Sequence, residues 1–181
     1  RFNISSGEWH ASATPARIST VLGTCVAVCL YDPVKQVGGM NHFMLPQATG
    51  EEGPLAARYG VHAMELLVNT LMELGADRAG LRAKVFGAAH VIRGMESGEA
   101  VARKNAHFVR TFLEREAIPV EAEFLGGNQA LVVQFFTHTG KARVKPLSVI
   151  PQQLIERDRS GSSTMSAHEP VLFGAEQDVS S

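Results

Sequence analysis

Two apolar segments separated by a short turn constrain the fold of this chain more than any other feature. The segment 25–31, Cys-Val-Ala-Val-Cys-Leu-Tyr, is rich in β-branched and apolar residues, and the segment 40–45 is stopped by Pro46. Between them, Asp32-Pro33 begins a turn and Gly38-Gly39 marks its far side. Apolar runs bounded in this way predict the two neighbouring strands of an antiparallel hairpin.

The remaining elements alternate irregularly between strands and helices. Apolar residues at helical spacing predict one helix over 59–74, closed by Gly75, and a second helix over 99–116. Strand-forming segments are expected at 16–22, 81–86, 120–125, 130–137 and 142–147. The order differs from the strict alternation of a doubly wound fold. It predicts an α+β fold in which a mixed sheet, or two packed sheets, carries helices on the outside.

The buried faces of both helices follow from the same spacing. In the first helix the core-facing residues are expected to be Val61, Met64, Val68, Leu71 and Met72. In the second they are expected to be Val101, Asn105, Phe108, Val109, Phe112 and Leu113, with Arg103, Lys104, Arg110 and Glu114 facing solvent. Each helix should therefore cover a sheet with one face.

Length and composition predict one folded domain followed by a tail. The chain has 181 residues, of which 45% are apolar and 19% charged, which is typical of a folded globular domain. We expect residues 1–150 to form a single domain and the polar, Ser-rich residues 151–181 to form a disordered or loosely docked tail. Residues 47–54 are expected to form an exposed loop.

Charge and cysteine spacing exclude several classes of function. Lys plus Arg is 17 and Asp plus Glu is 18, so the net charge of −1 gives no global attraction to nucleic acid or anionic membranes. No segment approaches the roughly 20 apolar residues of a membrane helix, and no signal-peptide pattern precedes the first strand. Cys25 and Cys29 on one strand would have Cα atoms about 13 Å apart, too far for a disulfide. Two reduced thiols predict a cytoplasmic protein.

A thiol and an imidazole share one face of the predicted hairpin. Alternation places Cys25 and Cys29 on one face of the first strand and His42 on the matching face of the second. A turn centred on Pro33-Val34 sets Cys25 opposite His42, whereas a turn centred on Lys35-Gln36 sets Cys29 opposite His42. Opposed residues have Cβ atoms about 5 Å apart. The pattern therefore predicts a Cys–His pair suited to nucleophilic catalysis, with either cysteine as its thiol.

The sequence around Cys25, Cys29 and His42 bears on whether these residues are catalytic, structural or metal-binding. The Gly23-Thr24 turn favours Cys25, because such a turn can direct backbone N–H groups at a developing oxyanion. The alternative is a structural role, since cysteine is among the most buried residue types, and Cys29, among apolar neighbours, is expected to lie in the core. A zinc site of Cys25, Cys29 and His42 lacks a fourth ligand at a suitable spacing, so no metal or other cofactor is expected.

Two blocks of this sequence form a specific signature, LGTCVAVCLYDP at 22–33 and GGMNHFMLP at 38–46. Supporting blocks are AKVFGAA at 83–89, ARKN at 102–105, Gly126-Gly127 and Thr139-Gly140-Lys141. Together these blocks resemble the signature of CheD, the family of chemoreceptor glutamine deamidases in bacterial chemotaxis. The resemblance extends over roughly Gly7 to Leu147.

The resemblance implies a fold, a site and a reaction. The fold would have a β-sandwich-like core flanked by helices, similar to a toxin deamidase with a cysteine-hydrolase site. Cys25 would be the nucleophile and His42 the catalytic histidine, with a third member five or six positions before the nucleophile. Those positions hold Thr20 and Ser19, and residue type favours Thr20. The reaction would be deamidation of glutamines on methyl-accepting chemotaxis receptors through a cysteine thioester, and the CheC phosphatase would be a partner.

The chain also departs from the family pattern. Thr24 stands where a Ser usually precedes the nucleophile, Gly87-Ala88-Ala89 replaces Gly-Gly-Ala, and Ala130-Leu131 lies near the place of a usual Gly-Arg. These changes leave the catalytic block intact and bear on substrate preference and partner binding. The alternative function is a non-catalytic adaptor that binds receptors or CheC.

Overall fold

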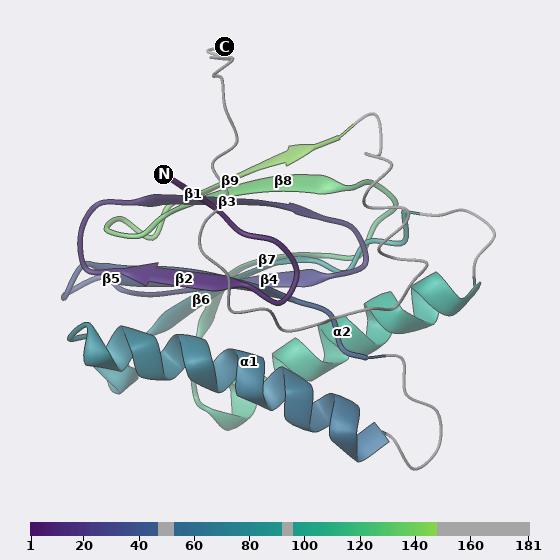
Figure 1. The fold of residues 1–181 in the computed structure, drawn as a ribbon, viewed down its shortest axis with the longest axis horizontal. Coiled ribbons are helices and arrows are strands. Elements are labelled where there is room, and N and C mark those ends of the chain that lie inside the picture. The colour runs from purple at the N-terminus through teal and green to yellow at the C-terminus, as the bar shows by residue number, and fades with distance from the viewer. Residues whose placement is uncertain (47–52, 92–95, 148–181) are drawn as a thin grey trace.

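The computed structural model describes residues 1–46, 53–91 and 96–147. In these residues two β-sheets and two α-helices form three layers (Figure 1). The four-stranded sheet forms one outer layer, the five-stranded sheet lies in the middle, and helices α1 (Gly53–Glu73) and α2 (Glu96–Arg115) cover the other face of the five-stranded sheet. The predicted tail, 151–181, lies outside the described residues. So do residues 47–52 of the predicted loop.

The two sheets have different strand orders. The four-stranded sheet has the order β1 (Phe2–Asn3), β3 (Arg17–Leu22), β8 (Leu131–Phe136), β9 (Ala142–Pro146). The five-stranded sheet has the order β2 (Trp9–Ser12), β5 (Val37–Phe43), β4 (Val26–Asp32), β6 (Arg82–Gly87), β7 (Val120–Leu125). The β1–β3 and β6–β7 pairs are parallel, and the other pairs are antiparallel. These two packed, mixed sheets confirm the predicted α+β fold.

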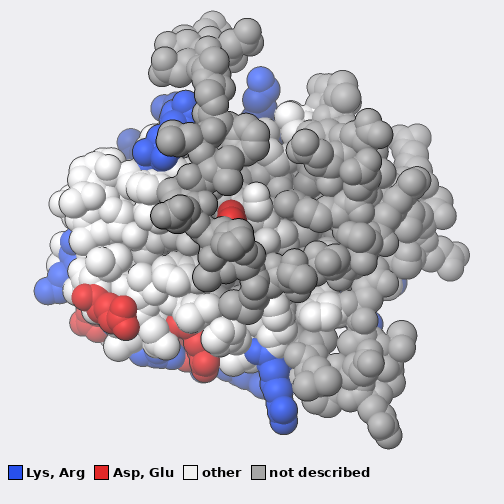
Figure 2. Space-filling model, in the orientation of Figure 1, with Lys and Arg blue, Asp and Glu red and all other residues white. Residues whose placement is uncertain are grey.

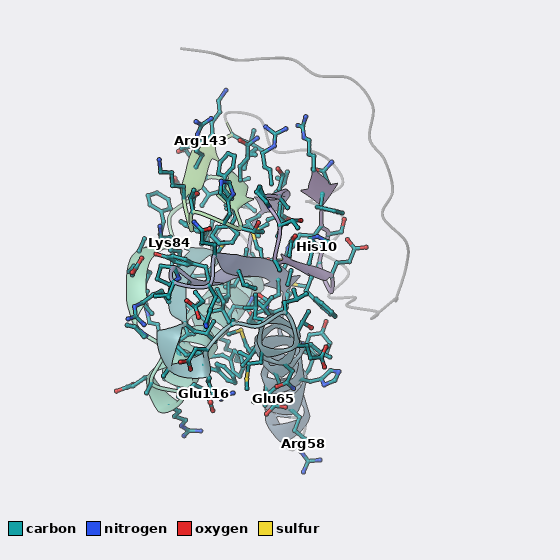
Figure 3. All side chains as sticks on the ribbon, turned by 90° about the vertical axis from the view of Figure 1, so that its left-hand side faces the viewer. His10, Arg58, Glu65, Lys84, Glu116 and Arg143 are labelled. Atoms are coloured by element: carbon teal, nitrogen blue, oxygen red, sulfur yellow. The ribbon has the colours of Figure 1, made fainter. Side chains whose placement is uncertain are left out.

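Two apolar layers hold the molecule together. One lies between the five-stranded sheet and the helices, where Val28 and Leu30 of β4 pack with Leu67 of α1 and Val109 of α2. The other lies between the sheets, where side chains from both, including Ile18, Leu22, Cys29, Met40 and Phe135, form one buried cluster. Figure 3 shows the layers from the side, with Arg143 at the four-stranded sheet and Arg58 and Glu65 on α1 at the opposite end. Strand β4 therefore faces a core on both sides, which explains its continuous apolar sequence.

The helices agree with their predicted stripes with one exception. Asn105, Val109 and the other predicted residues of α2 are buried or half-buried. In α1, Met72 is 44% exposed, so its predicted burial is wrong, and Leu67 is buried in its place. Helix α1 also begins at Gly53, before the predicted start, because Pro54 in a first turn loses no helical hydrogen bond. Residues 53–54 therefore belong to a helix and not to the predicted loop.

The C-terminus of α1 was predicted correctly. Gly75 has a φ of +97°, the N–H of Gly75 donates to the Met72 carbonyl and the N–H of Ala76 donates to the Leu71 carbonyl. This is the Schellman arrangement, which requires a left-handed residue just after the helix.

The register of the β4–β5 hairpin differs from both predicted registers. His42 lies opposite Ala27, and Cys29 lies opposite Met40. The loop between the strands is centred on Val34-Lys35, because the Asp32 carboxylate accepts hydrogen bonds from the N–H groups of both residues, at 2.8 and 3.0 Å. The shared face of thiols and imidazole is nevertheless confirmed, since each predicted register differs from the observed one by two positions.

The described surface carries both signs of charge. Figure 2 shows Lys and Arg and Asp and Glu in small separate groups on the described part of one face. Within residues 1–46, 53–91 and 96–147, no helix is long and apolar enough to cross a membrane.

Candidate active site

Of the three residues implied by the resemblance, Thr20 and His42 are in contact between the two sheets, and Cys25 is buried in the same layer. Thr20 lies on β3 of the four-stranded sheet, His42 lies on β5 of the five-stranded sheet, and Cys25 lies in the turn that enters β4. Their exposed fractions are 4%, 1% and 1%. The packing of one sheet on the other brings Thr20 to His42, so the arrangement depends on the tertiary fold.

The Thr20 hydroxyl is in direct contact with the imidazole. Thr20 Oγ1 lies 2.8 Å from His42 Nδ1 and donates to the carbonyl oxygen of Ile4 at 2.7 Å. A hydroxyl has a single hydrogen and a carbonyl can only accept. The hydroxyl hydrogen therefore points at Ile4, and the Thr20 oxygen accepts the N–H of His42 Nδ1. In this tautomer the lone pair is on Nε2, the nitrogen that can act as a base.

Ser19 lies on the other face of β3. Alternation along the strand directs Ile18, Thr20 and Leu22 between the sheets, and Ser19 points away from them. Its buried hydroxyl has no hydrogen-bond partner among the described residues. Of the two hydroxyls left open by the sequence, only that of Thr20 contacts His42.

Cys25 lies diagonally from His42 across the hairpin. Ala27 is directly opposite His42, and Cys25 is two positions before Ala27 on the same face. Diagonal neighbours have Cα atoms about 7–8 Å apart and Cβ atoms somewhat closer, within reach of longer side chains. The Cys25 thiol also lies 3.9 Å from the hydroxyl of Ser6, close enough for a weak hydrogen bond to sulfur. Thiol and imidazole thus share one buried face at the end of β4.

Cys29 has a different environment. It is fully buried in the middle of β4, where burial raises the pKa of its thiol well above the usual range and the nearby Lys84 only partly opposes this. A thiol held in its protonated form is a poor nucleophile. The predicted core role of Cys29 agrees with this placement. The two cysteines form no disulfide, and the described part of the chain has no group of three His, Cys, Asp or Glu residues that could hold a metal ion.

A segment near the N-terminus contacts all three candidate residues and was not identified from the sequence. Over residues 4–8, the Ile4 carbonyl accepts from Thr20, Ser6 lies beside Cys25, and the backbone of Gly7 and Glu8 bonds the backbone of His42 at 2.7 and 2.9 Å. This segment connects β1 in one sheet to β2 in the other. Most of these contacts use backbone groups, which every residue type has, so the sequence carries little signal for them.

The turn that carries Cys25 packs closely on the end of β6. Gly87 has a φ of +109°, and a Cβ at this position would lie 2.2 Å from the carbonyl oxygen of Cys25. Glycine is therefore required here both by backbone conformation and by space. Gly87 is the one glycine of the block at 83–89, and it lies against the candidate nucleophile.

Known proteins match most of this chain. The family model described as "CheD chemotactic sensory transduction" matches residues 44–146, which lie after Cys25 and His42. A protein of Thiobacillus denitrificans named "Probable chemoreceptor glutamine deamidase CheD" is 45% identical over 169 residues, covering 91% of this chain and 83% of that protein. A "CheD 2" of the same description from Chromobacterium violaceum is 48% identical over 143 residues, covering 78% of this chain and 71% of that protein.

Two further proteins show similarity to this chain. A "CheD 1" from Shewanella oneidensis is 45% identical over 155 residues, covering 84% of this chain and 75% of that protein. The crystal structure of Bacillus licheniformis YfiH aligns with 64% of this chain and 49% of that chain at a TM-score of 0.41 and 16% identity, a likeness that carries no functional information. The match over residues 44–146 and the extent of the identity to these relatives lead to one conclusion: this chain belongs to the CheD family.

Proposed function

We propose that this chain is a chemoreceptor glutamine deamidase, which converts glutamine side chains of methyl-accepting chemotaxis receptors to glutamate and releases ammonia. The printed names of its relatives describe this activity for those proteins. The observation that carries the proposal in this chain is the contact of 2.8 Å between Thr20 Oγ1 and His42 Nδ1, on the buried face that also holds Cys25. The proposed catalytic residues are Cys25, His42 and Thr20.

The first half of the proposed reaction forms a thioester. His42 Nε2 takes the proton of the Cys25 thiol, and the thiolate attacks the side-chain amide carbon of the substrate glutamine. Backbone N–H groups of the turn at 23–25 stabilise the negative charge on the amide oxygen. The C–N bond then breaks, and His42 returns the proton to the leaving ammonia.

The second half hydrolyses the thioester. His42 accepts a proton from a water molecule, which attacks the acyl carbon, and the Cys25 sulfur leaves and is reprotonated. The products are a glutamate carboxylate and the original thiol. Thr20 holds the imidazole through Nδ1 throughout, but a neutral hydroxyl stabilises the imidazolium less than a carboxylate would. Because Cys25 and His42 are each 1% exposed, a receptor glutamine can enter only when the surrounding surface opens.

The decisive experiment compares two cysteine variants. Cys25→Ala should abolish the conversion of receptor glutamine to glutamate, measured by peptide mass on purified receptor fragments, and should leave the circular dichroism spectrum unchanged. Cys29→Ala is the matched control and should retain activity close to that of the wild type, because Cys29 lies in the core away from the turn. Glutamate formation by Cys25→Ala, or loss of activity only in a folded Cys29→Ala, would exclude the proposed nucleophile.

Two further proposals concern the cellular location of this activity and a protein partner. We propose a cytoplasmic location, where thiols stay reduced and where the receptor helices that carry methylated glutamates are found. We propose also that the CheC phosphatase binds this chain, as the family resemblance implies. Co-elution of the two purified proteins in size-exclusion chromatography tests the second expectation, and separate elution at micromolar concentration would contradict it.

A further inference from the structure

Every carbonyl group of the turn that carries Cys25 is engaged by a donor from another element. The carbonyl of Gly23 accepts from the N–H of Ala89 at 2.9 Å, and that of Cys25 accepts from the N–H of Ala88 at 2.7 Å. The carbonyl between them, that of Thr24, accepts from the side chain of Asn105 at 2.9 Å. The first two donors belong to the segment after β6, and the third belongs to α2.

Asn105 also contacts the segment that follows His42. Its Oδ1 accepts from the N–H of Leu45 at 2.9 Å, while its Nδ2 donates to Thr24. The residue is completely buried, and its amide uses one donor and one acceptor to join two segments of the site. The Cys25 turn and the extension of β5 are thus linked through a single side chain.

The hydrogen bond from Asn105 to the Thr24 carbonyl also determines the direction of the Cys25 N–H. The Thr24 carbonyl and the Cys25 N–H belong to one planar trans peptide unit, in which the two groups point in opposite directions. Asn105 draws the carbonyl toward α2, on the outer side of the five-stranded sheet. The Cys25 N–H therefore points away from the Asn105 side chain, while the Cys25 side chain lies in the buried cluster between the sheets.

We propose that Asn105 is a positioning residue for the deamidation reaction. By holding the Thr24 carbonyl it orients the Cys25 N–H as a donor to the oxyanion, and by holding Leu45 it keeps the nucleophile turn in place relative to the strand of His42. This inference rests on the proposed function. It assigns a chemical role to the asparagine that ends the block at 102–105.

The test uses Asn105→Asp, which has nearly the same shape and keeps an acceptor for Leu45. Above the pKa of the new carboxyl it has no hydrogen to donate to Thr24, and we expect kcat for glutamine deamidation to fall on the order of 10- to 100-fold, since loss of a whole oxyanion donor costs about 100- to 1,000-fold. KM should stay within about threefold, because the interaction develops only in the transition state. Burial raises the pKa of a carboxyl, and its protonated form can donate. The ratio of variant to wild-type kcat should therefore rise as the pH is lowered from 8 to 6.

The matched control is Asn41→Asp. Asn41 is also buried, and its amide likewise accepts from a strand N–H, that of Val28, and donates to a helix carbonyl, that of Ala63. This variant should lose stability but keep a kcat per folded molecule close to that of the wild type. If the buried charge prevents Asn105→Asp from folding, Asn105→Ala removes the donor without adding charge and is judged by the same kcat.

Three outcomes would overturn the inference. They are a folded Asn105 variant with kcat within threefold of wild type, a change confined to KM, and an equal loss of kcat in Asn41→Asp. The wild type and Cys25→Ala are assayed alongside. If the wild type shows no Cys25-dependent glutamate formation, the proposed function fails, whereas an active wild type with an equally active Asn105 variant rejects only the role of Asn105.

Discussion

At the scale of single residues, one hydroxyl determines which nitrogen of His42 carries the proton. Thr20 Oγ1 donates to the Ile4 carbonyl and so can only accept from His42 Nδ1. In the proposed mechanism, Thr20 and the Ile4 carbonyl would orient the imidazole as a carboxylate does in catalytic triads, without placing a charge beside it. A backbone carbonyl from the N-terminal segment is therefore part of the machinery that orients the proposed base.

Substitution of Thr20 tests this role. Thr20→Val keeps the shape of the side chain but removes the acceptor for Nδ1–H, and we expect kcat to fall on the order of 10- to 100-fold because the imidazole loses its preferred tautomer and orientation. Thr20→Ser keeps the hydroxyl and should restore most of the activity. Steady-state deamidation rates of purified variants give the comparison.

Ser19→Ala provides the control for that prediction. Its hydroxyl has no partner among the described residues and points away from the space between the sheets, so activity should remain within about twofold of wild type. A large loss in Ser19→Ala together with an unaffected Thr20→Val would show that the third member had been assigned to the wrong hydroxyl.

At the scale of the elements, the β4–β5 hairpin takes its register from Asp32. This carboxylate is 1% exposed and accepts from the N–H groups of Val34, Lys35 and Asp77 at 2.8, 3.0 and 2.8 Å. Burial alone would raise its pKa, but these three hydrogen bonds and the charge of Lys35 outweigh burial and hold the pKa below its ordinary value. The pattern of strand-forming residues does not show which backbone N–H groups bond the Asp32 carboxylate. The sequence therefore predicted two registers and missed the correct one.

The lowered pKa of Asp32 makes hairpin stability depend on pH. A carboxyl whose pKa is lower in the folded state contributes stability that is present above its unfolded pKa, about 3.8, and is lost as the pH falls through its folded pKa. Asp32→Asn should lower the free energy of unfolding at pH 7 by about 2–4 kcal/mol, because the N–H of Asp77 loses its acceptor. The loss should become smaller below pH 4. Urea denaturation at several pH values measures both effects.

The control for this prediction is Asp77→Asn. Asp77 is exposed and caps the short 3-10 helix η2 (Arg78–Gly80), a role that Asn fills equally well. Its free energy of unfolding should stay within about 0.5 kcal/mol of wild type. The prediction fails if Asp32→Asn and Asp77→Asn give the same dependence on pH.

At the scale of the whole molecule, a hydrogen bond joins the turn between β8 and β9 of the four-stranded sheet to β6 of the five-stranded sheet. The Gly140 carbonyl accepts from Lys84 Nζ at 2.7 Å, and the Lys84 ammonium lies 5.4 Å from the centre of the Tyr31 ring. Burial and the hydrogen bond to the Glu121 carboxylate raise the pKa of Tyr31 to about 12, so the ring stays neutral at physiological pH. The Thr139-Gly140-Lys141 block therefore has a structural explanation, distinct from the site.

Gly140→Ala tests this attachment. A Cβ at Gly140, which has a φ of +65°, would lie 2.2 Å from the Tyr31 ring, so the turn must shift. We expect a loss of about 2–4 kcal/mol in the free energy of unfolding, measured with urea, from backbone strain and overpacking together. Gly126→Ala is the matched control, since Gly126 also has a positive φ but has open space around it, and should cost about 1–2 kcal/mol. Equal losses would show that contact with Tyr31 is not what requires glycine.

Most of the elements, the fold class and the shared face of Cys25, Cys29 and His42 could be predicted from the sequence alone. These properties follow from local periodicity, and a hairpin register displaced by two positions leaves the face unchanged. The short strands β1 and β2 escaped prediction, because two to four residues carry too little pattern.

Tertiary structure alone decided which groups meet. Thr20 reaches His42 because one sheet packs on the other, and Asn105 reaches the Cys25 turn because α2 packs on the five-stranded sheet. The Ile4 carbonyl enters the site because the chain crosses between the sheets at that point. A catalytic arrangement depends on distances between segments far apart in the sequence, and those distances are set by how the layers pack, which local patterns do not encode.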